Sequence, residues 1–134
     1  MEIKVSTENG RVPVTVMHVD GNIDAASYET FKAKADELIK NGARHILVDL
    51  LHAPFVSSAG LRALHGIFND LRAINKDDGM SDEEIKKGIG DGTYKSPHLK
   101  LLNLSNETLT AFKLSGFDMY IETFTDRKTA IASY

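Results

Sequence analysis

Apolar residues follow two different spacings along the chain, and the two spacings alternate. Period-two alternation and short apolar runs predict strands near 3–5, 12–19, 46–51, 99–104 and 117–124. Spacings of three and four residues predict helices at 27–40, from 57–58 onward, at 106–112 and after Thr125 or Asp126. The predicted order is therefore β-β-α-β-α-β-α-β-α.

The run Ile46–Leu51 is almost continuously apolar, which is typical of a central strand covered on both faces. Strands that alternate with helices favour a mixed β-sheet with a parallel core, right-handed crossovers and helices packed on the sheet. We therefore expect an α/β fold, with residues 1–134 forming a single domain.

Capping and turn residues set the predicted element boundaries. Asn9-Gly10 favours a hairpin turn with positive φ. Ser27 and Asn106 are candidate helix N-caps, and Gly116 suits the C′ position of a helix. The predicted core stripes are Tyr28, Phe31, Ala35 and Leu38 in the first helix, and Leu61, Leu64, Phe68 and Leu71 in the second, with Ile67 and Ile74 widening the latter.

The segment from Asn75 to Pro97 is polar and long for a connection between a helix and a strand. Ser81 and Glu84 have the spacing of a capping box, so one or two helical turns are expected at Asp82–Lys87. The remainder is polar and rich in Gly and Asp, so it is predicted to be a flexible surface insertion. Gly88–Gly92 within it is not a phosphate-binding loop, because it lacks the Lys-Ser/Thr of that motif. A loop that contacts a partner is the alternative.

Composition excludes several classes of function. The net charge of −3 gives no overall attraction for nucleic acid or anionic lipid, so neither is expected as a direct partner. Without cysteine the chain has no disulfide and no thiolate metal site. No apolar run approaches the roughly 20 residues that cross a bilayer, and the N-terminus is unlike a signal peptide. We expect a cytoplasmic protein.

The polar residues do not indicate an enzyme or a metal protein. None of the five histidines pairs with another at metal-ligand spacing, and the acidic residues at 77–78 and 82–84 lack the pattern of a calcium loop. A hydrolase that uses Ser58 and His52 is an alternative, but no Gly-x-Ser-x-Gly elbow is present. We therefore expect no catalytic residue, no metal and no cofactor.

Two serines at a predicted helix start, Ser57 and Ser58, offer the clearest candidate site. The first backbone amides of a helix have no internal partner, and the helix dipole places partial positive charge there. A phosphate on a serine at this position would gain both donors and favourable charge. Gly60 would let another backbone or a nucleotide approach closely. Serine is also an ordinary N-cap, so a purely structural role is the alternative.

Three segments together resemble the STAS domain family, which includes the anti-sigma factor antagonists. Gly21-Asn22-Ile23-Asp24 resembles the family's Gly-x-Leu/Ile-Asp turn before the first helix. Ile46-Leu47-Val48-Asp49-Leu50 resembles its central strand. Phe55-Val56-Ser57-Ser58-Ala59-Gly60-Leu61 resembles the stretch that usually reads as an apolar pair followed by Asp-Ser-Ser/Ala-Gly-Leu. The resemblance covers nearly the whole chain except the 75–97 insertion.

The resemblance implies partner switching in signal transduction and transcription regulation. Carried over, Ser58 is the phosphoacceptor, and the partner is an anti-sigma factor that is also a serine kinase, with a phosphatase as a further partner. The unmodified domain would bind the kinase and the phosphorylated domain would be released. The implied partner-binding residues are Gly21, Asn22, Ile23, Asp24, Ser57, Ser58, Ala59, Gly60 and Arg62.

One departure from the family pattern opens an alternative. Ser57 stands where the family has aspartate, so the negative charge beside Ser58 is missing. Ser57 is then an alternative acceptor, or neither serine is modified. In the latter case the chain would be a scaffold or sensor domain that binds a protein, a nucleotide or another anion without phosphorylation.

Overall fold

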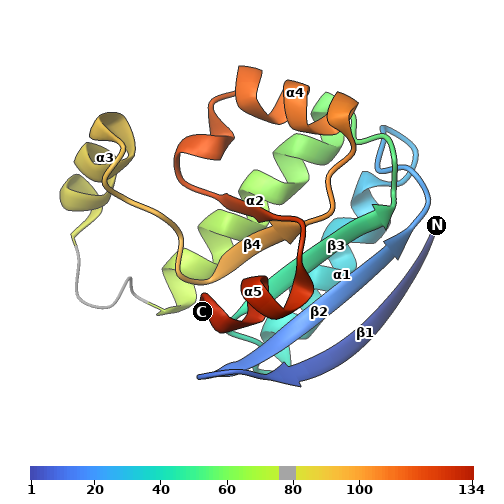
Figure 1. Cartoon of the computed structure of the whole chain (residues 1–134), viewed down its shortest axis with the longest axis horizontal. Coiled ribbons are helices and arrows are strands. Elements are labelled where there is room, and N and C mark those ends of the chain that lie inside the picture. Colours follow the sequence, from blue (N-terminus) through green and yellow to red (C-terminus); the bar gives the residue numbers. More distant parts are fainter. Residues whose placement is uncertain (76–80) are drawn as a thin grey trace.

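Five strands form one mixed sheet in the computed structural model, which describes residues 1–75 and 81–134 (Figure 1). The strand order is β1-β2-β3-β4-β5; β1 and β2 are antiparallel, and all other neighbours are parallel. The strands are β1 Glu2–Asn9, β2 Pro13–Asp20, β3 Ile46–His52, β4 Leu99–Leu102 and β5 Glu122–Phe124. The helices are α1 Tyr28–Lys40, α2 Ser58–Asn75, α3 Asp82–Asp91, α4 Asn106–Leu114, α5 Arg127–Ala132 and the 3-10 turn η2 Phe117–Met119. The predicted fold class is confirmed.

The central strand β3 is buried on both faces from Ile46 to Leu50, apart from the half-buried Asp49, as its apolar run predicts, whereas Leu51 at the end of the run is 59% exposed. Val48 belongs to the larger core cluster, which packs the sheet against α1, α2 and α4. Leu47 points to the opposite face and belongs to a smaller cluster with Val16, Leu102 and Ala130 of α5. The sheet therefore has three helices on one face, while the short helix α5 covers part of the other (Figure 1).

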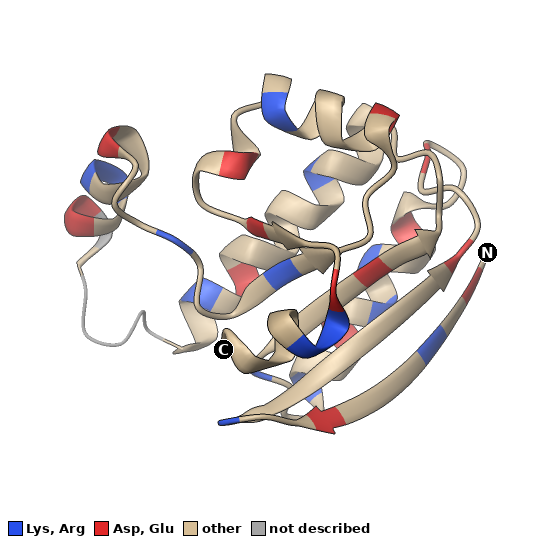
Figure 2. Ribbon diagram, in the orientation of Figure 1, with Lys and Arg blue, Asp and Glu red and all other residues tan. Residues whose placement is uncertain are grey.

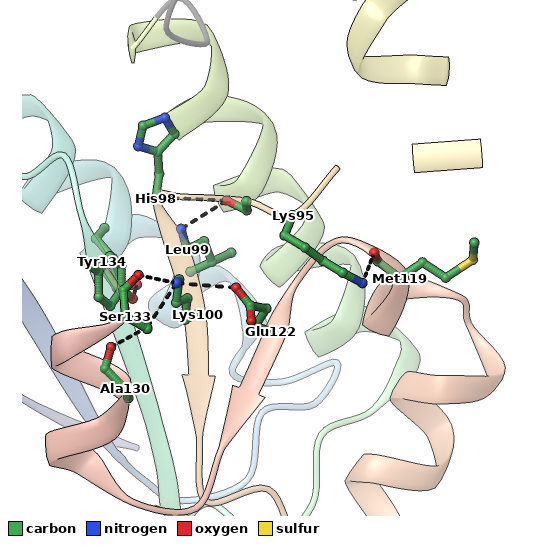
Figure 3. A network of polar contacts seen from close by, with 11 residues as sticks. Lys95, His98, Leu99, Lys100, Met119, Glu122, Ala130, Ser133 and Tyr134 are labelled. Atoms are coloured by element: carbon green, nitrogen blue, oxygen red, sulfur yellow. Dashed lines mark hydrogen bonds and ion pairs between the residues drawn. The ribbon is translucent and has the colours of Figure 1, made fainter. Parts of the chain in front are cut away.

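A buried lysine holds α5 against the sheet (Figure 3). Lys100 of β4 is only 3% exposed, and its Nζ donates to the carbonyl and the hydroxyl oxygens of Ser133 at 3.0 and 2.9 Å. The ammonium also lies 3.4 Å from the Glu122 carboxylate and 4.9 Å from the centre of the Tyr134 ring. These contacts place a cation at the C-terminal end of α5, where the helix dipole favours it.

The described part of the 75–97 insertion, from residue 81 onward, is more ordered than predicted. Ser81 and Glu84 form both hydrogen bonds of the expected capping box, and α3 runs to Asp91 instead of ending near Lys87. The expectation of a flexible loop at Gly88–Gly92 is therefore wrong: its first residues are helical, and Gly92 is the left-handed C-cap. Burial explains the extension, because Ile85 is fully buried in the main core and Ile89 packs against it.

Three other expected details differ from the structure. The 9–10 turn has no positive φ, because β1 and β2 are joined by a three-residue loop, 10–12, which does not require it. Strand β4 ends at Leu102 because Asn103 turns the chain with φ 60. Residues 117–124 form η2 and a short β5 after Gly116, which has the predicted C′ geometry with φ 83.

The predicted helix stripes are confirmed at most positions, but in the first helix Tyr28 and Leu38 are only partly buried, and Ile39 is buried instead of Leu38. Phe31, Leu61, Leu64, Phe68 and Leu71 are buried, whereas Ile74 is 43% exposed near the end of α2. Among the residues that the structure describes, no helix is long and apolar enough to cross a bilayer.

Candidate functional site

Ser58 is the first residue of α2, and its side chain is exposed. Ser57 precedes it in the N-cap position: its Oγ accepts a hydrogen bond from the Gly60 N–H at 3.3 Å, and its carbonyl accepts from the Leu61 N–H at 2.8 Å. Within the described chain, the amides of Ser58 and Ala59 have no hydrogen-bond partner. Two donors at the positive end of an 18-residue helix therefore lie beside an accessible hydroxyl.

The 21–24 turn lies directly beside this helix start, although more than 30 residues separate them in sequence. The Gly21 N–H donates to the His52 carbonyl at 3.0 Å, and the Ile23 N–H donates to the Phe55 carbonyl at 3.0 Å. The Ser57 N–H donates to the Ile23 carbonyl at 2.8 Å. These bonds form a short parallel ladder, so the two segments expected to bind one partner make one continuous surface.

Side-chain hydrogen bonds fix the shape of the 21–24 turn. Asp24 Oδ1 accepts from the Ala26 N–H at 2.9 Å and from the Ser27 hydroxyl at 3.1 Å. Ser27 also donates to the Asn22 carbonyl at 2.7 Å and accepts from the Asp24 N–H at 3.0 Å. Ser27 occupies the N-cap position of α1 but makes no side-chain cap, because its hydroxyl is engaged in the turn. Gly21 has φ 118, a conformation that favours glycine.

A third element holds the loop between β3 and α2. The Pro54 carbonyl accepts hydrogen bonds from the hydroxyls of Ser105 and Thr108, at 2.7 and 3.3 Å. Ser105 is the N-cap of α4, one residue before the predicted Asn106, and its Oγ also accepts from the Thr108 N–H. The helix start at Ser58 is thus built on a loop that is tied to two neighbouring segments.

The residues predicted to bind a partner differ in accessibility. Asn22, Ser58 and Arg62 are exposed, and Gly21, Asp24 and Ser57 are half-buried. Ile23, Ala59 and Gly60 are buried, so they shape the surface without offering side chains to a partner. The backbone that approaches Gly60 closely is that of the chain's own 21–24 turn, not that of a partner. A Cβ added to Gly60 would lie 2.7 Å from both the Ile23 carbonyl oxygen and Val56 Cγ1.

Two large apolar side chains in the segment that leads to Ser58 are exposed, and neither was predicted as part of the site. Leu51 is 59% exposed at the end of β3, and Phe55 is 45% exposed in the following loop. Both residues lie within or beside apolar runs of the sequence. Such runs predict burial, so the sequence does not indicate that these two side chains are exposed.

A network of polar side chains lies on the face of the sheet that α5 partly covers, opposite the face that packs against α1 and α2. Ser6 Oγ lies 3.0 Å from His18 Nε2, and His18 Nδ1 lies 3.2 Å from Asp49 Oδ2. Asp49 Oδ1 accepts from the Leu51 N–H and from Asn103 Nδ2, at 3.0 and 3.2 Å. This order of groups is that of a Ser–His–acid relay. However, Ser6 lies within a strand and not at the strand-to-helix turn that exposes a hydrolase nucleophile. We assign the network to holding β1, β2, β3 and Asn103 together.

The structure gives no support to the alternative chemistry. No hydrogen bond joins Ser58 to His52 in the described chain. The part of the chain that the structure describes contains no group of three His, Asp or Glu side chains suited to a metal. Of the acidic loop residues, Asp77, Asp78 and the side chain of Asp82 lie outside the described part.

Comparison with solved structures supports the fold. The Thermotoga maritima protein TM1081 aligns with a TM-score of 0.71 and 12% identity over 96% of this chain and 91% of that chain. An anti-sigma factor antagonist from Mycobacterium paratuberculosis gives 0.67 and 15%, covering 98% and 93%. The Bacillus cell-fate determinant SpoIIAA in its phosphorylated form gives 0.63 and 19%, covering 97% and 96%.

Sequence comparison identifies the family. No curated protein sequence matches the chain significantly. The sequence profile of the STAS domain, however, matches residues 4–77, more than half of the 134 residues. The matched region includes the 21–24 turn, β3 and the start of α2, which are the segments that form the candidate site. This protein therefore belongs to the STAS domain family.

Proposed function

We propose that this protein is an anti-sigma factor antagonist that binds its partner when unmodified and is released when Ser58 is phosphorylated. The observation that carries the proposal is the exposed Ser58 hydroxyl on the first residue of α2, beside the 21–24 turn. The partner would be an anti-sigma factor that is also a serine kinase, and a phosphatase would restore the binding form.

Helix geometry favours a phosphate at Ser58. The free amides of Ser58 and Ala59 and the dipole of α2 would stabilise the added charge of about −1.5 to −2. Arg62 is exposed and four residues further along α2, so it lies on the same helix face as Ser58. The phosphorylated side chain would therefore be accommodated without rebuilding the fold.

The surroundings of Ser58 also explain how the phosphate would cause release. Phe55 offers exposed apolar area in the loop just before this polar helix start, a combination found in protein interfaces. In a complex this area would be removed from water. A phosphate placed there would have to be desolvated, and it would repel acidic groups of the partner. The same group is thus tolerated in the free protein and unfavourable in the complex.

The relatives are consistent with this mechanism. SpoIIAA is named an anti-sigma factor antagonist, and its structures include an unphosphorylated and a phosphorylated form. This chain shares the fold of that protein at 18–19% identity, so the extension of its regulation to Ser58 is part of the proposal.

Ser57 favours a second candidate function. Its hydroxyl provides the N-cap hydrogen bond to Gly60, but it contributes no negative charge next to Ser58. If a kinase requires that charge, Ser58 would stay unmodified. The protein would then be a constitutive scaffold or sensor that binds a protein, a nucleotide or another anion at the same helix start.

The proposal is tested by incubating the purified chain with a candidate anti-sigma factor kinase and ATP–Mg²⁺. We expect peptide mass mapping to find one phosphate on Ser58. The Ser58→Ala variant should not be phosphorylated. Ser81→Ala is the control and should be phosphorylated normally, because Ser81 is an exposed N-cap serine outside the site. Ser58→Asp should weaken kinase binding at least about tenfold. The absence of phosphate from both Ser57 and Ser58, with binding unaffected by Ser58→Asp, would contradict the switch. Binding that persists without phosphate but is lost in Arg62→Glu would support the scaffold.

A further inference from the structure

Strand β1 forms a long edge of the sheet. All eight of its residues pair with β2 on the inner side, from Glu2 opposite Asp20 to Asn9 opposite Pro13. The strand order ends at β1, so its outer side has no strand partner among the described residues. The opposite edge, β5, is only three residues long. An edge of this length presents a row of unpaired backbone donors and acceptors to the surroundings.

Among the features by which proteins prevent edge-to-edge pairing, this edge has charged residues but neither a bulge nor a proline. The register with β2 is regular throughout, so no bulge twists β1 away from a potential partner. The strand contains no proline. Lys4 is the one basic residue of β1; an edge lysine ordinarily opposes pairing, but an acidic residue opposite it in a second strand would turn that contact into an attraction. We propose that the outer edge of β1 pairs antiparallel with β1 of a second copy of this chain.

Among the registers that pair most of β1, its charges favour one. With Ser6 opposite Ser6 of the second copy, Lys4 lies opposite Glu8 on one face, and Val5 lies opposite Thr7 on the other. Two-fold symmetry makes each pair occur twice. A register centred on Val5 would set Glu2 opposite Glu8, and one centred on Lys4 would set two lysines together. Opposite charges that face each other across strands stabilise pairing, and like charges destabilise it.

The two charged side chains are available for this contact. Lys4 is exposed and makes no ion pair within residues 1–75 and 81–134. Glu8 lies 3.9 Å from Arg127, at the limit of an ion pair, and both side chains are partly exposed. Figure 2 shows the basic position of β1 between acidic positions toward the two ends of the strand.

The candidate regulatory site stays free in this dimer. The Glu2 end of β1 lies beside the 21–24 turn, because Glu2 pairs with Asp20 and an added Cβ on Gly21 would lie 3.4 Å from the Met1 Cα. Antiparallel pairing sends the two Glu2 ends in opposite directions. The dimer would therefore carry two Ser58 sites at its two ends, and its existence is independent of whether Ser58 is phosphorylated.

Sedimentation equilibrium of the full chain tests the proposal, over roughly 5 to 500 µM because pairing of single strands gives a small, weak interface. We expect a reversible monomer–dimer equilibrium. Lys4→Glu and Glu8→Lys should each raise the dimer dissociation constant at least about tenfold, and the double exchange Lys4→Glu/Glu8→Lys should restore it to within about threefold. Lys86→Glu, which makes the same charge change on the exposed surface of α3, should have no effect.

A measurement on the unchanged protein provides a second test. Alternate backbone amides of β1 should exchange with solvent more slowly as the protein concentration rises, while the amides of β5 should not change. A single-copy mass at every concentration would overturn the proposal, as would a dimer that neither charge reversal weakens. A double exchange that remains monomeric would overturn the Ser6-centred register.

Discussion

Gly60 in α2 and Ile23 in the 21–24 turn lie so close that a Cβ added to Gly60 would approach the Ile23 carbonyl oxygen to 2.7 Å. The same carbonyl accepts the Ser57 N–H, so the turn cannot withdraw without losing a hydrogen bond. Gly60 is therefore required by the packing that joins the two halves of the candidate site.

Replacement of Gly60 should weaken the fold and disturb the site together. We expect Gly60→Ala to lower the free energy of unfolding by about 1–3 kcal/mol, because the methyl group must displace backbone atoms. Gly90→Ala is the matched control, since Gly90 is helical and an added Cβ meets nothing within 4 Å. That variant should be neutral or more stable by up to about 1 kcal/mol. Equal effects in urea denaturation would contradict the packing argument.

Two substitutions of Ser57 should separate the effect of its capping hydrogen bond from the effect of a negative charge at this position. Ser57→Ala removes the cap to Gly60 and should cost about 1 kcal/mol, whereas Ser57→Asp keeps an acceptor and adds about 0.3–1 kcal/mol of favourable interaction with the dipole of α2. With the proposed kinase, Ser57→Asp should also raise the rate of Ser58 phosphorylation. Parallel measurements of thermal stability and phosphate incorporation check both effects. A faster reaction in Ser57→Ala would show that the charge is irrelevant.

Lys100 should control the docking of α5. Lys100→Met removes the bonds to Ser133 without stranding a buried charge, because Glu122 is 41% exposed. We expect a loss of about 1–3 kcal/mol and faster limited proteolysis within 127–134. Lys95→Met is the control, since Lys95 is exposed and donates to one carbonyl, that of Met119 (Figure 3). Unchanged protection of α5 in Lys100→Met would contradict this role.

His65 and Tyr120 should make stability depend on pH at both extremes. Tyr120 OH lies 2.9 Å from His65 Nδ1. Burial, with a smaller effect from Arg72, lowers the pKa of His65, and burial raises the pKa of Tyr120 to about 12. As the pH falls below about 6.5, the unfolded chain therefore binds a proton at His65 more readily than the folded protein does. As the pH rises from about 10 to 12, the unfolded chain loses the Tyr120 proton more readily than the folded protein does. Stability should fall in both directions.

Unfolding by urea across this pH range, with two variants, assigns the effects. His65→Phe should flatten the acid side, while its ring keeps the stacking on Phe117, whose centre lies 5.2 Å away. Tyr120→Phe should flatten part of the alkaline side only. NMR titration of His65 should give a pKa below 6.5. A His65 pKa above that value would reverse the expected acid behaviour.

Local sequence signals predicted the elements that depend on local physics. The apolar run of β3, the capping box at Ser81 and Glu84, and the final helix capped by Asp126 are all present. The extension of α3 was missed because it depends on tertiary packing: Ile85 is buried in the main core, and the Tyr94 ring meets Phe68 with centres 6.3 Å apart. Glycines at 88 and 90 therefore remain helical despite their low propensity.

The site was predictable only in part for a similar reason. Ser58 and the 21–24 turn were found because their residues follow a family pattern, and the structure places them side by side. The His18–Asp49–Asn103 contacts join residues that are scattered in sequence, so neither spacing nor periodicity indicates them. The exposure of Leu51 and Phe55 likewise depends on which neighbours the fold supplies.

Helix α2 fixes the distance between Ser58 and Asn75. It begins at Ser58 and ends at Asn75, where the chain leads toward α3. At a rise of about 1.5 Å per residue, these ends are about 25 Å apart. A single partner that contacts both Ser58 and the Asn75 end of α2 must therefore cover about 25 Å of helix, the full length of this element.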